Sequence, residues 1–418
     1  MKAIIHHISS GSLAVANHLL LFTSNFLIYL MLVRTLDLNA LGEWALFITW
    51  ASIIDQFRQG FIHHDLINLI HKYPLQEAKL ISSAFIFNLG IIVFLSIPLM
   101  FLSLMNIIPE LFYFIILSSL SSGLIQFINS ILIAHENLRM QFKINLLFTL
   151  LSGTATFLLF YYDMLDIQIL LWVQLCSSLT VLLYYLLSTK ISYCRPHYYL
   201  ILKLFKFGKY AGSGNLLSLL FHKSDILILS LFVNKEAIAL YHFASKVINY
   251  IEIPLNGLSQ FLFPKLSKYY LQFRQLLFDP IYFKSIAIMI ISLIPGLLII
   301  VISPEIILKI FSSEDLKNAF SLIYILMIAT VIKPFGRVLG LSIDAINQPQ
   351  LNTQILAFSL VSNLVLNFLL IPQLGIEGAA IATLTAILFT ILSGHFIVYK
   401  KYMSHSFSIN FSNFLKKS

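Results

Sequence analysis

Two cations stand one helical turn apart in an apolar part of the sequence. Residues 331–340 read VIKPFGRVLG and follow the run SLIYILMIAT, whose hydropathy predicts a membrane-spanning helix. Like charges at positions i and i+4 repel each other, and a cation at the centre of a bilayer costs roughly 3 kcal/mol. Lys333 and Arg337 on one face suit a multivalent anion, above all a phosphate or diphosphate. We therefore predict that this face lines a water-filled cavity; the alternative is a structural ion pair with Asp344 or Glu252.

Pro334 lies between the two cations, and two glycines follow it. Proline removes one backbone hydrogen bond of a helix and allows a bend. Gly336 and Gly340 lower the bulk beside the charges, so we expect a ligand or a neighbouring helix to come close there.

A lysine and an acid also interrupt the apolar segment FHKSDILILS (221–230). Lys223 and Asp225 are two residues apart, so they do not share a helix face. Each is expected to meet another helix or water. A salt bridge between two halves of the protein and a place in a cavity wall fit this pattern equally well.

The segment YHFASKVINYIEIP (241–254) carries a polar stripe. His242, Lys246 and Tyr250 recur at steps of four, which places them on one face of a helix. We predict that this face borders a cavity. Glu252 is offset from the stripe and is a candidate carrier of a coupling proton, since acids inside membranes are commonly functional.

The segment IDQFRQGFIHHDL (54–66) holds a further charged pair. Asp55 and Arg58 are spaced to form a local ion pair, and a place in a cavity wall is the equal alternative. The His63, His64 and Asp65 triplet has residue types that bind metals, but its place at a predicted helix end favours an interfacial position. We predict no metal site.

The candidate site is therefore a set of buried charges drawn from both halves of the chain. The cations predicted to bind cargo are Lys333, Arg337, Lys246, Lys223 and Arg58, and the acids predicted to act as counter-ions or to couple protons are Asp55, Asp225 and Glu252. Cations outnumber acids, which favours anionic cargo. The same balance argues against an exporter of cationic drugs.

The composition is that of a polytopic membrane protein. Of the 418 residues, 59% are hydrophobic and only 11% are charged, with a mean hydropathy of +0.88; soluble chains are nearer about 25% charged. The first apolar run, which reaches Val33, is expected to be a span rather than a cleaved signal. Cys176 and Cys194 indicate neither a disulfide framework nor a thiolate metal site. No phosphate-binding loop or nucleophile motif is found, so an enzyme is not predicted.

Apolar runs of about 20 residues predict about 12 transmembrane helices. They lie near 11–33, 43–67, 80–104, 110–134, 144–162, 168–189, 209–232, 238–263, 284–303, 318–343, 353–372 and 378–399. Polar residues interrupt the second, eighth and tenth. Most of the 27 Lys and Arg residues fall on one predicted side, which places both termini in the cytoplasm. The net charge of +9 is thus an orientation signal, and no nucleic acid is expected as a partner.

The two halves of the chain resemble each other. LNALGEW (38–44) matches KEAIALY (235–241), and AHENLRM (134–140) matches AINQPQL (345–351). The matches occur in the same order and join corresponding spans. We therefore predict an N-terminal six-helix lobe at 1–200 and a C-terminal six-helix lobe at 201–418, related by a pseudo-two-fold axis along the membrane normal around a central cavity.

Three segments resemble a known family. They are NFLLIPQLGIEGAAIATLTA (367–386), KSDILILSLFVNKEAIALYHFASKV (223–247) and RTLDLNALGEWALF (34–47). The first is similar to a signature of polysaccharide flippases, the O-antigen and exopolysaccharide repeat-unit exporters of the multidrug/oligosaccharidyl-lipid/polysaccharide exporter superfamily. Its matching residues are Asn367, Ile371, Pro372, Gly375, Gly378, Ala379, Ala380 and Thr383. The resemblance covers essentially the whole chain and departs from the family at His63, His64 and Asp65.

The resemblance implies a MATE-like fold and a transport function. The expected cargo is an undecaprenyl-diphosphate-linked oligosaccharide, moved from the cytoplasmic to the periplasmic leaflet by alternating access. The buried cations would neutralise the diphosphate, and the acids would release the cargo or couple H⁺ or Na⁺; no other cofactor is implied. The implied location is the bacterial cytoplasmic (inner) membrane, with the lipid bilayer, a polysaccharide polymerase and a chain-length regulator as partners.

Three alternatives remain open at this point. A multidrug cation antiporter of the same superfamily would need a cavity dominated by acids. A lipid II flippase would be expected to carry two further spans beyond the last apolar run near residue 400. A non-transporting membrane scaffold for glycan synthesis would not require buried cations.

Overall fold

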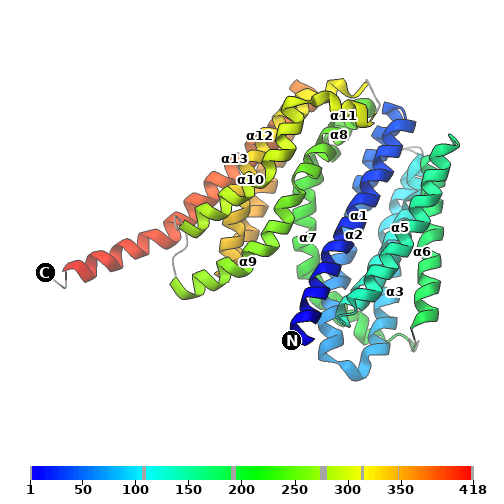
Figure 1. Ribbon diagram of the computed structural model, residues 1–418, viewed down its shortest axis with the longest axis horizontal. Helices are drawn as coiled ribbons and strands as arrows, with labels where there is room; N and C mark the ends of the chain where they lie inside the picture. Colours follow the sequence, from blue (N-terminus) through cyan, green and yellow to red (C-terminus); the bar gives the residue numbers. More distant parts are fainter. Residues whose placement is uncertain are drawn as a thin grey trace. The chain divides into compact units, whose positions relative to one another are not determined.

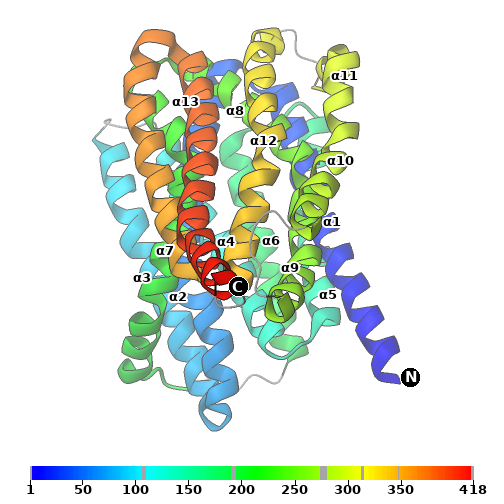
Figure 2. The same ribbon diagram turned by 90° about the vertical axis from the view of Figure 1, so that its left-hand side faces the viewer.

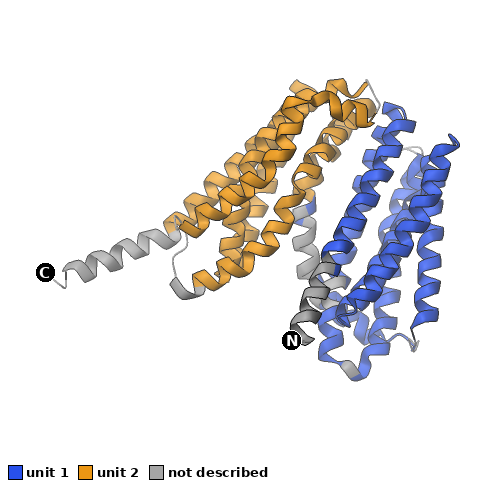
Figure 3. Ribbon diagram, in the orientation of Figure 1, with its two compact units in different colours: residues 1–219 blue, residues 220–418 orange. Residues whose placement is uncertain are grey.

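The computed structural model describes residues 2–105, 110–189, 194–273, 280–311, 315–346 and 348–415. Every regular element within these ranges is a helix, so the predicted all-α class is confirmed. The chain divides into two compact units, residues 1–219 and 220–418 (Figure 3). The sequence analysis placed a boundary after residue 200, near the start of α7 (Tyr198–Phe232). The division between the two units falls within that helix, after residue 219.

The first unit is built on a central helix. Its long helices are α1 (Lys2–Thr35), α2 (Leu38–Lys72), α3 (Glu77–Leu104), α4 (Ile115–Ala134), α5 (Leu138–Tyr161) and α6 (Ile167–Ser188), with the short 3₁₀ helices η1 (Pro74–Gln76) before α3 and η2 (Glu110–Phe114) before α4 (Figure 1). Helix α4 packs against α2, α3, α5 and α6, and α1 packs against α5. The first turns of α7 also pack here, since Leu200 and Leu204 are buried among residues of α2 and α3.

The second unit repeats this plan. After the remainder of α7 it contains α8 (Lys235–Ile251), α9 (Ile253–Phe273), α10 (Pro280–Ile302), α11 (Pro304–Phe311), η3 (Asp315–Ala319), α12 (Phe320–Ala345) and α13 (Pro349–Leu415) (Figure 2). Helix α12 packs against α8, α9, α10 and α13. It holds the central place that α4 holds in the first unit, and each is the fourth predicted span of its half.

Eight stretches of the described residues are long and apolar enough to cross a membrane. They are Val15–Thr35, Glu77–Leu104, Glu110–Ala134, Leu138–Tyr161, Ile167–Ser188, Pro280–Ile302, Asp315–Ala345 and Pro349–Lys400. The last contains a kink and comprises two predicted spans. The predicted spans near 43–67, 209–232 and 238–263 are helical but do not belong to this set. The spans near 43–67 and 238–263 carry charged residues, which lower the apolar character of a helix, and much of the span near 209–232 lies outside the side chains that the structure describes.

The predicted repeat is visible in the turn that precedes the second helix of each unit. Asp37 caps α2 by accepting a hydrogen bond from the Ala40 backbone N–H, and Asn234 caps α8 by accepting one from that of Ala237. The φ and ψ angles are −69° and 167° at Asp37, and −71° and 166° at Asn234. Side-chain acceptors at this position satisfy a free backbone donor of the first turn. The two matching sequence segments therefore begin with the same local structure.

Helix α13 doubles back at Gly375, so that its two limbs run side by side (Figure 2). Gly375 has φ of +58° and ψ of −135°, which other residues adopt only with strain. Just beyond, a Cβ atom on Gly378 would lie 2.4 Å from the Leu370 carbonyl oxygen. Ala379 and Ala380 are fully buried. The tight turn at Gly375 and the small residues that follow it let the two limbs of α13 pack closely.

We expect Gly378→Ala to destabilise the protein, because the new Cβ would meet backbone that cannot rotate away. Overpacking of this kind costs about 1–3 kcal/mol. Gly153→Ala is the matched control, since nothing lies within 4 Å of a Cβ at Gly153 of α5 and alanine favours a helix over glycine by about 0.5–1 kcal/mol. Thermal unfolding of the purified protein should give a midpoint below that of the wild type for Gly378→Ala and above it for Gly153→Ala. Equal midpoints would contradict the packing argument.

Candidate functional site

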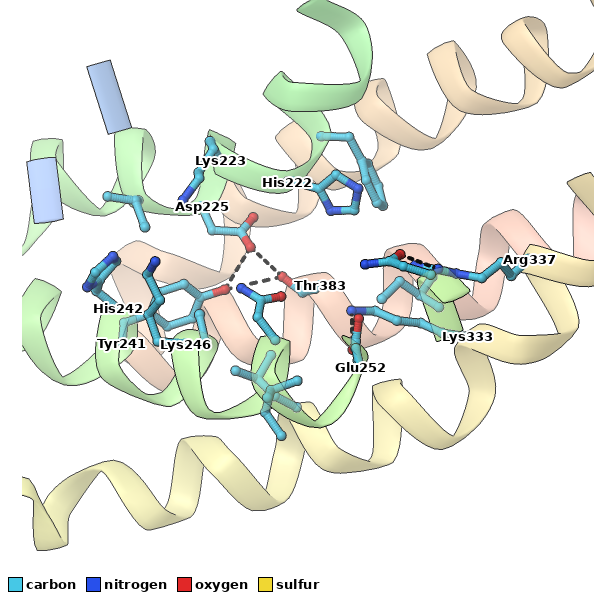
Figure 4. Close-up of a pocket in the computed structure, with 18 residues that line it drawn as sticks. His222, Lys223, Asp225, Tyr241, His242, Lys246, Glu252, Lys333, Arg337 and Thr383 are labelled. Carbon is cyan, nitrogen blue, oxygen red and sulfur yellow. Dashed lines mark hydrogen bonds and ion pairs between the residues drawn. The ribbon is translucent and has the colours of Figure 1, made fainter. Parts of the chain in front are cut away.

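A cavity of about 390 Å³ lies within the second unit, bordered by α7, α8, α9, α12 and α13 (Figure 4). Six of the eight charged residues singled out in the sequence line it: Lys223, Asp225, Lys246, Glu252, Lys333 and Arg337. These are four cations and two acids, brought together from segments far apart in the chain. The structure therefore gathers three of the predicted polar segments around one space.

Lys333 reaches the cavity from α12 and meets the acid that follows α8. Pro254 disfavours a continuous helix at this point, so α8 ends at Ile251 and α9 starts at Ile253. Glu252 lies in the break, where its Oε1 accepts hydrogen bonds from Lys333 Nζ at 2.6 Å and Thr330 Oγ1 at 2.7 Å. The structural ion pair and the cavity position are thus both present. Of the two partners considered for Lys333, the one found is Glu252.

Arg337 lies one turn further along the same face of α12. Its Nη1 donates to Asn256 Oδ1 at 2.6 Å, which orients the guanidinium toward the cavity. The glycines beside it admit a neighbouring helix as expected: a Cβ on Gly336 would lie 3.0 Å from Ile391, and one on Gly340 would lie 3.4 Å from Asn352. Both neighbours belong to α13. The helix continues through Pro334 without interruption.

Asp225 is held by neutral donors at the other end of the cavity (Figure 4). It accepts hydrogen bonds from Tyr241 Oη of α8 at 2.7 Å, and from Thr383 Oγ1 and Asn367 Nδ2 of α13 at 2.7 and 2.8 Å. Asp225 is 5% exposed. Several hydrogen bonds to a carboxylate stabilise its charged form. Asp225 therefore meets two other helices, and Lys223, although on a different face of α7, lines the same cavity.

The polar stripe of α8 faces this cavity in part. His242 and Lys246 line it, together with Ser245 and Asn249. Tyr250, the third member of the stripe, does not belong to the lining residues that the structure describes. The stripe thus borders the cavity at its N-terminal end and turns away from it near the end of α8.

Arg58 and Asp55 lie in the first unit, where they form a closed polar cluster. Arg58 is only 1% exposed. Its Nη1 donates to Asn88 Oδ1 at 3.0 Å, and its Nη2 contacts Gln126 Oε1 and Asp55 Oδ1, the latter at 3.4 Å. Ser122 Oγ also donates to Asp55 at 2.8 Å. The sequence left open a local ion pair or a place in a cavity wall, and the structure shows the local ion pair. A cargo-binding role for Arg58 stays a prediction.

The internal repeat relates this cluster to the cavity of the second unit. Counting along the chain from the matched segments LNALGEW and KEAIALY places Asp55 opposite Glu252. Counting back from AHENLRM and AINQPQL places Ser122 opposite Lys333. The Ser122–Asp55 contact and the Lys333–Glu252 contact are therefore the same contact in the two halves. In each unit an acid of the second span accepts a hydrogen bond from the central helix.

The sequence analysis missed three residues of the Asp225 cluster: Tyr241, Thr383 and Asn367. Asn367 and Thr383 stand in the family-like segment 367–386. The sequence therefore singled out both residues but did not indicate that they bind Asp225. No group of three or more His, Cys, Asp or Glu that could hold a metal occurs in the part of the chain that the structure describes. The side chains of His63, His64 and Asp65 lie outside that description.

We expect Thr383→Val to destabilise the second unit, because it removes one hydrogen bond to the buried Asp225. Bonds to charged groups contribute about 1.5–3 kcal/mol. Thr385→Val is the matched control: the Thr385 hydroxyl donates to Ile381 and Ala382 backbone carbonyls of its own helix. Thermal unfolding should show a clearly lower midpoint for Thr383→Val only. Equal decreases in the two variants would mean that the hydrogen bond to Asp225 does not stabilise the protein.

We expect Arg58→Met to destabilise the first unit, since it leaves Asp55 buried beside no cation. Breaking one side of a buried pair costs about 3–5 kcal/mol. The double variant Asp55→Asn/Arg58→Met should recover part of this loss, because no uncompensated charge remains. Membrane level and thermal unfolding measure both effects. An Arg58→Met protein that is as stable as the wild type but inactive would instead indicate direct contact with cargo.

Comparisons with known proteins agree with this fold and with the sequence pattern. Over 235 residues the chain is 27% identical to the probable low-salt glycan biosynthesis flippase Agl15 of Haloferax volcanii, covering 56% of this chain and 50% of that protein. Over 237 residues it is 24% identical to the putative O-antigen transporter of Shigella flexneri, covering 56% of each. The chain thus matches about half the length of these curated relatives.

Solved structures show the same fold. A multidrug resistance MATE family transporter in an inward-facing conformation superposes with a TM-score of 0.72 at 15% identity, covering 90% of this chain and 94% of that one. The lipid II flippase MurJ in an inward closed conformation gives 0.70 at 18% identity, covering 92% and 87%. These likenesses confirm the predicted MATE-like architecture. A family profile described as polysaccharide biosynthesis protein matches residues 12–270, and the chain therefore belongs to the polysaccharide biosynthesis protein family.

Proposed function

We propose that this protein is a flippase that moves an undecaprenyl-diphosphate-linked oligosaccharide across the bacterial cytoplasmic membrane, from the cytoplasmic to the periplasmic leaflet. The observation that carries the proposal is the cavity of the second unit, where four cations and two acids line one space. A surplus of cations in a membrane-embedded space attracts anions. The names of the two sequence relatives, a glycan biosynthesis flippase and an O-antigen transporter, support the choice of cargo.

The diphosphate is the part of the cargo that the cations fit. Arginine presents a planar fork of donors to phosphate oxygens, and lysine presents a compact charge. Arg337 and Lys333 stand one turn apart on α12 and so supply both kinds of contact from one side. Lys333 is already paired with Glu252. An arriving phosphate would therefore share this lysine with the acid, and its departure would restore the ion pair.

Ion coupling and alternating access complete the proposal. Asp55, Asp225 and Glu252 are the acids that would accept a proton or a sodium ion, or release the cargo as counter-ions. Asp225 joins α7, α8 and α13 through its hydrogen bonds, so a change in its charge would act on three helices together. Glu252 would act on α12 through Lys333. The bias of Lys and Arg residues supports an orientation with both termini in the cytoplasm.

A cation antiporter is disfavoured by the charge of the cavity. Organic cations would be repelled by the four cations that line it. A scaffold without transport activity leaves these charges without a role. Both alternatives are outcomes of the experiment that follows, because neither requires Lys333 and Arg337 for export of a glycan.

We expect Lys333→Gln/Arg337→Gln to abolish or strongly reduce surface glycan in cells whose only copy carries the change. Loss of a hydrogen bond to a charged group is worth about 1.5–3 kcal/mol, or roughly tenfold or more in binding for each contact. Lipid-linked repeat units should accumulate in the cytoplasmic leaflet. Immunoblotting of surface glycan and extraction of lipid-linked intermediates measure the two effects.

The control removes two cations of the same unit that do not line the cavity, as Lys235→Gln/Lys309→Gln. This variant should make normal glycan at a normal membrane level. The proposal is wrong if the cavity variant, present at wild-type level, exports the glycan as well as the control does.

A further inference from the structure

A second cavity adjoins the cationic one. It has a volume of about 360 Å³ and lies between α12 and α13, within the size range of small-molecule sites of about 300–1,000 Å³. The two cavities share five lining residues: Phe221, His222, Lys333, Arg337 and Ile387. Lys333 and Arg337 thus stand at the junction. A molecule whose phosphate contacts these cations can extend into the second cavity without crossing a helix.

The second cavity is lined by both aliphatic and polar side chains. Leu341, Ile355, Leu356 and Ile391 supply aliphatic surface. Its polar side chains beyond the shared residues are Asp344, Asn352, Ser359 and Thr390. A pyranose ring likewise combines apolar C–H faces with hydroxyl groups around its edge. The lining therefore suits a sugar.

Asp344 and Asn352 form the most distinctive feature of this lining. Asn352 Nδ2 donates to both carboxylate oxygens of Asp344, at 3.2 Å each. No Lys or Arg of the described chain forms an ion pair with Asp344, although Arg337 lies two turns away on the same helix. A carboxylate keeps further acceptor positions after one such contact. The Asp344 side chain is half-buried and lines the cavity, so its carboxylate can accept hydrogen bonds from hydroxyl groups there.

Gly340 lets the Asn352 amide of this pair lie close to the backbone of α12. A Cβ at that position would lie 3.4 Å from Asn352 Oδ1 and 3.5 Å from its Nδ2. The amide therefore sits directly across from the bare backbone of α12. Any longer side chain on Gly340 would reduce the room beside the Asp344–Asn352 pair.

An apolar occupant fits this cavity poorly. A prenyl or acyl chain would remove the half-buried carboxylate from water and offer it no hydrogen bond, and such desolvation is costly. A free phosphate can contact Lys333 and Arg337 at the junction, but beside Asp344 it would place one anion next to another. Neutral groups with many hydroxyl donors avoid both penalties. The remaining chemistry that suits the site is a sugar attached next to a phosphate.

We propose that the second cavity is the subsite for the sugar nearest the diphosphate, with Asp344 and Asn352 as specificity-determining residues. This inference rests on the proposed function, because it takes the cargo to be a lipid-linked glycan. Asp344 accepts from sugar hydroxyls, and the apolar wall of α13 packs against the ring. Recognition at this point lets the protein distinguish a carrier that bears its glycan from one that does not.

The test compares two lipids on the purified full-length chain in lipid nanodiscs. One is undecaprenyl diphosphate, and the other is the lipid-linked repeat unit extracted from cells that make the surface glycan. We expect the wild type to bind the glycan-bearing lipid about tenfold more tightly, since a few hydrogen bonds correspond to roughly this factor. Asp344→Ala/Asn352→Ala should lose that preference. Lys333→Gln/Arg337→Gln should weaken binding of both lipids.

Two further variants keep the test independent of folding defects. Asp344→Asn retains the shape of the side chain and should lower the preference by a smaller factor. Glu305→Ala/Gln354→Ala removes one carboxylate and one amide that line neither cavity and should keep the full preference.

The outcomes separate the two proposals. If the wild type binds both lipids equally, or if the Asp344 variants keep the preference, the sugar subsite is overturned while the cationic site stands. If the wild type binds neither lipid, the proposed function itself fails. A preference that falls equally in the Glu305→Ala/Gln354→Ala variant also overturns the assignment.

Discussion

The ion pair between Lys333 and Glu252 is the contact on which the arrangement of the second unit depends. A lysine within the central helix must meet an acid or water, because isolated charge in hydrocarbon is costly. Glu252 can supply that acid only because Pro254 ends α8 and exposes a short break before α9. The bond of 2.6 Å thus ties the central helix to the one irregular point of its neighbour. The cationic cavity lies around this point.

The internal repeat places a polar contact at the same position in both units, buried in a cluster in the first and bordering a cavity in the second. In the first unit Asp55 accepts from Ser122, and Arg58 of its own helix supplies the cation. In the second unit the equivalent acid, Glu252, is paired with a lysine on the central helix instead. The cation therefore comes from the acid's own helix in the first unit and from the central helix in the second, where the contact borders a cavity. Arg337, which stands opposite Gln126 in the repeat, adds a further charge there.

Sequence reasoning reached the fold and much of the site because both follow from simple physical rules. Long apolar runs dictate membrane helices, and a charge inside such a run must face something other than lipid. These rules predicted a cavity lined by Lys333 and left a pair with Asp344 or Glu252 as the alternative; the structure shows the cavity and a pair with Glu252. They could not separate Arg58 from the cavity set, since burial in a closed cluster depends on Asn88 and Gln126 from other helices. Tyr241 and Thr383 were missed for the same reason: neutral hydroxyls give no signal until the fold places them beside Asp225.

The way Asp225 is held decides how the cavity presents its charge. Of the two acids that line the cavity, Glu252 is paired with a lysine. Asp225 instead accepts from a phenol, an alcohol and an amide, which are neutral donors. Hydrogen bonds of this kind stabilise the carboxylate without drawing a cation toward it. Three helices are thereby joined at this one carboxyl group. The cavity therefore contains two separate polar centres, the hydrogen-bonded Asp225 and the Lys333–Glu252 ion pair.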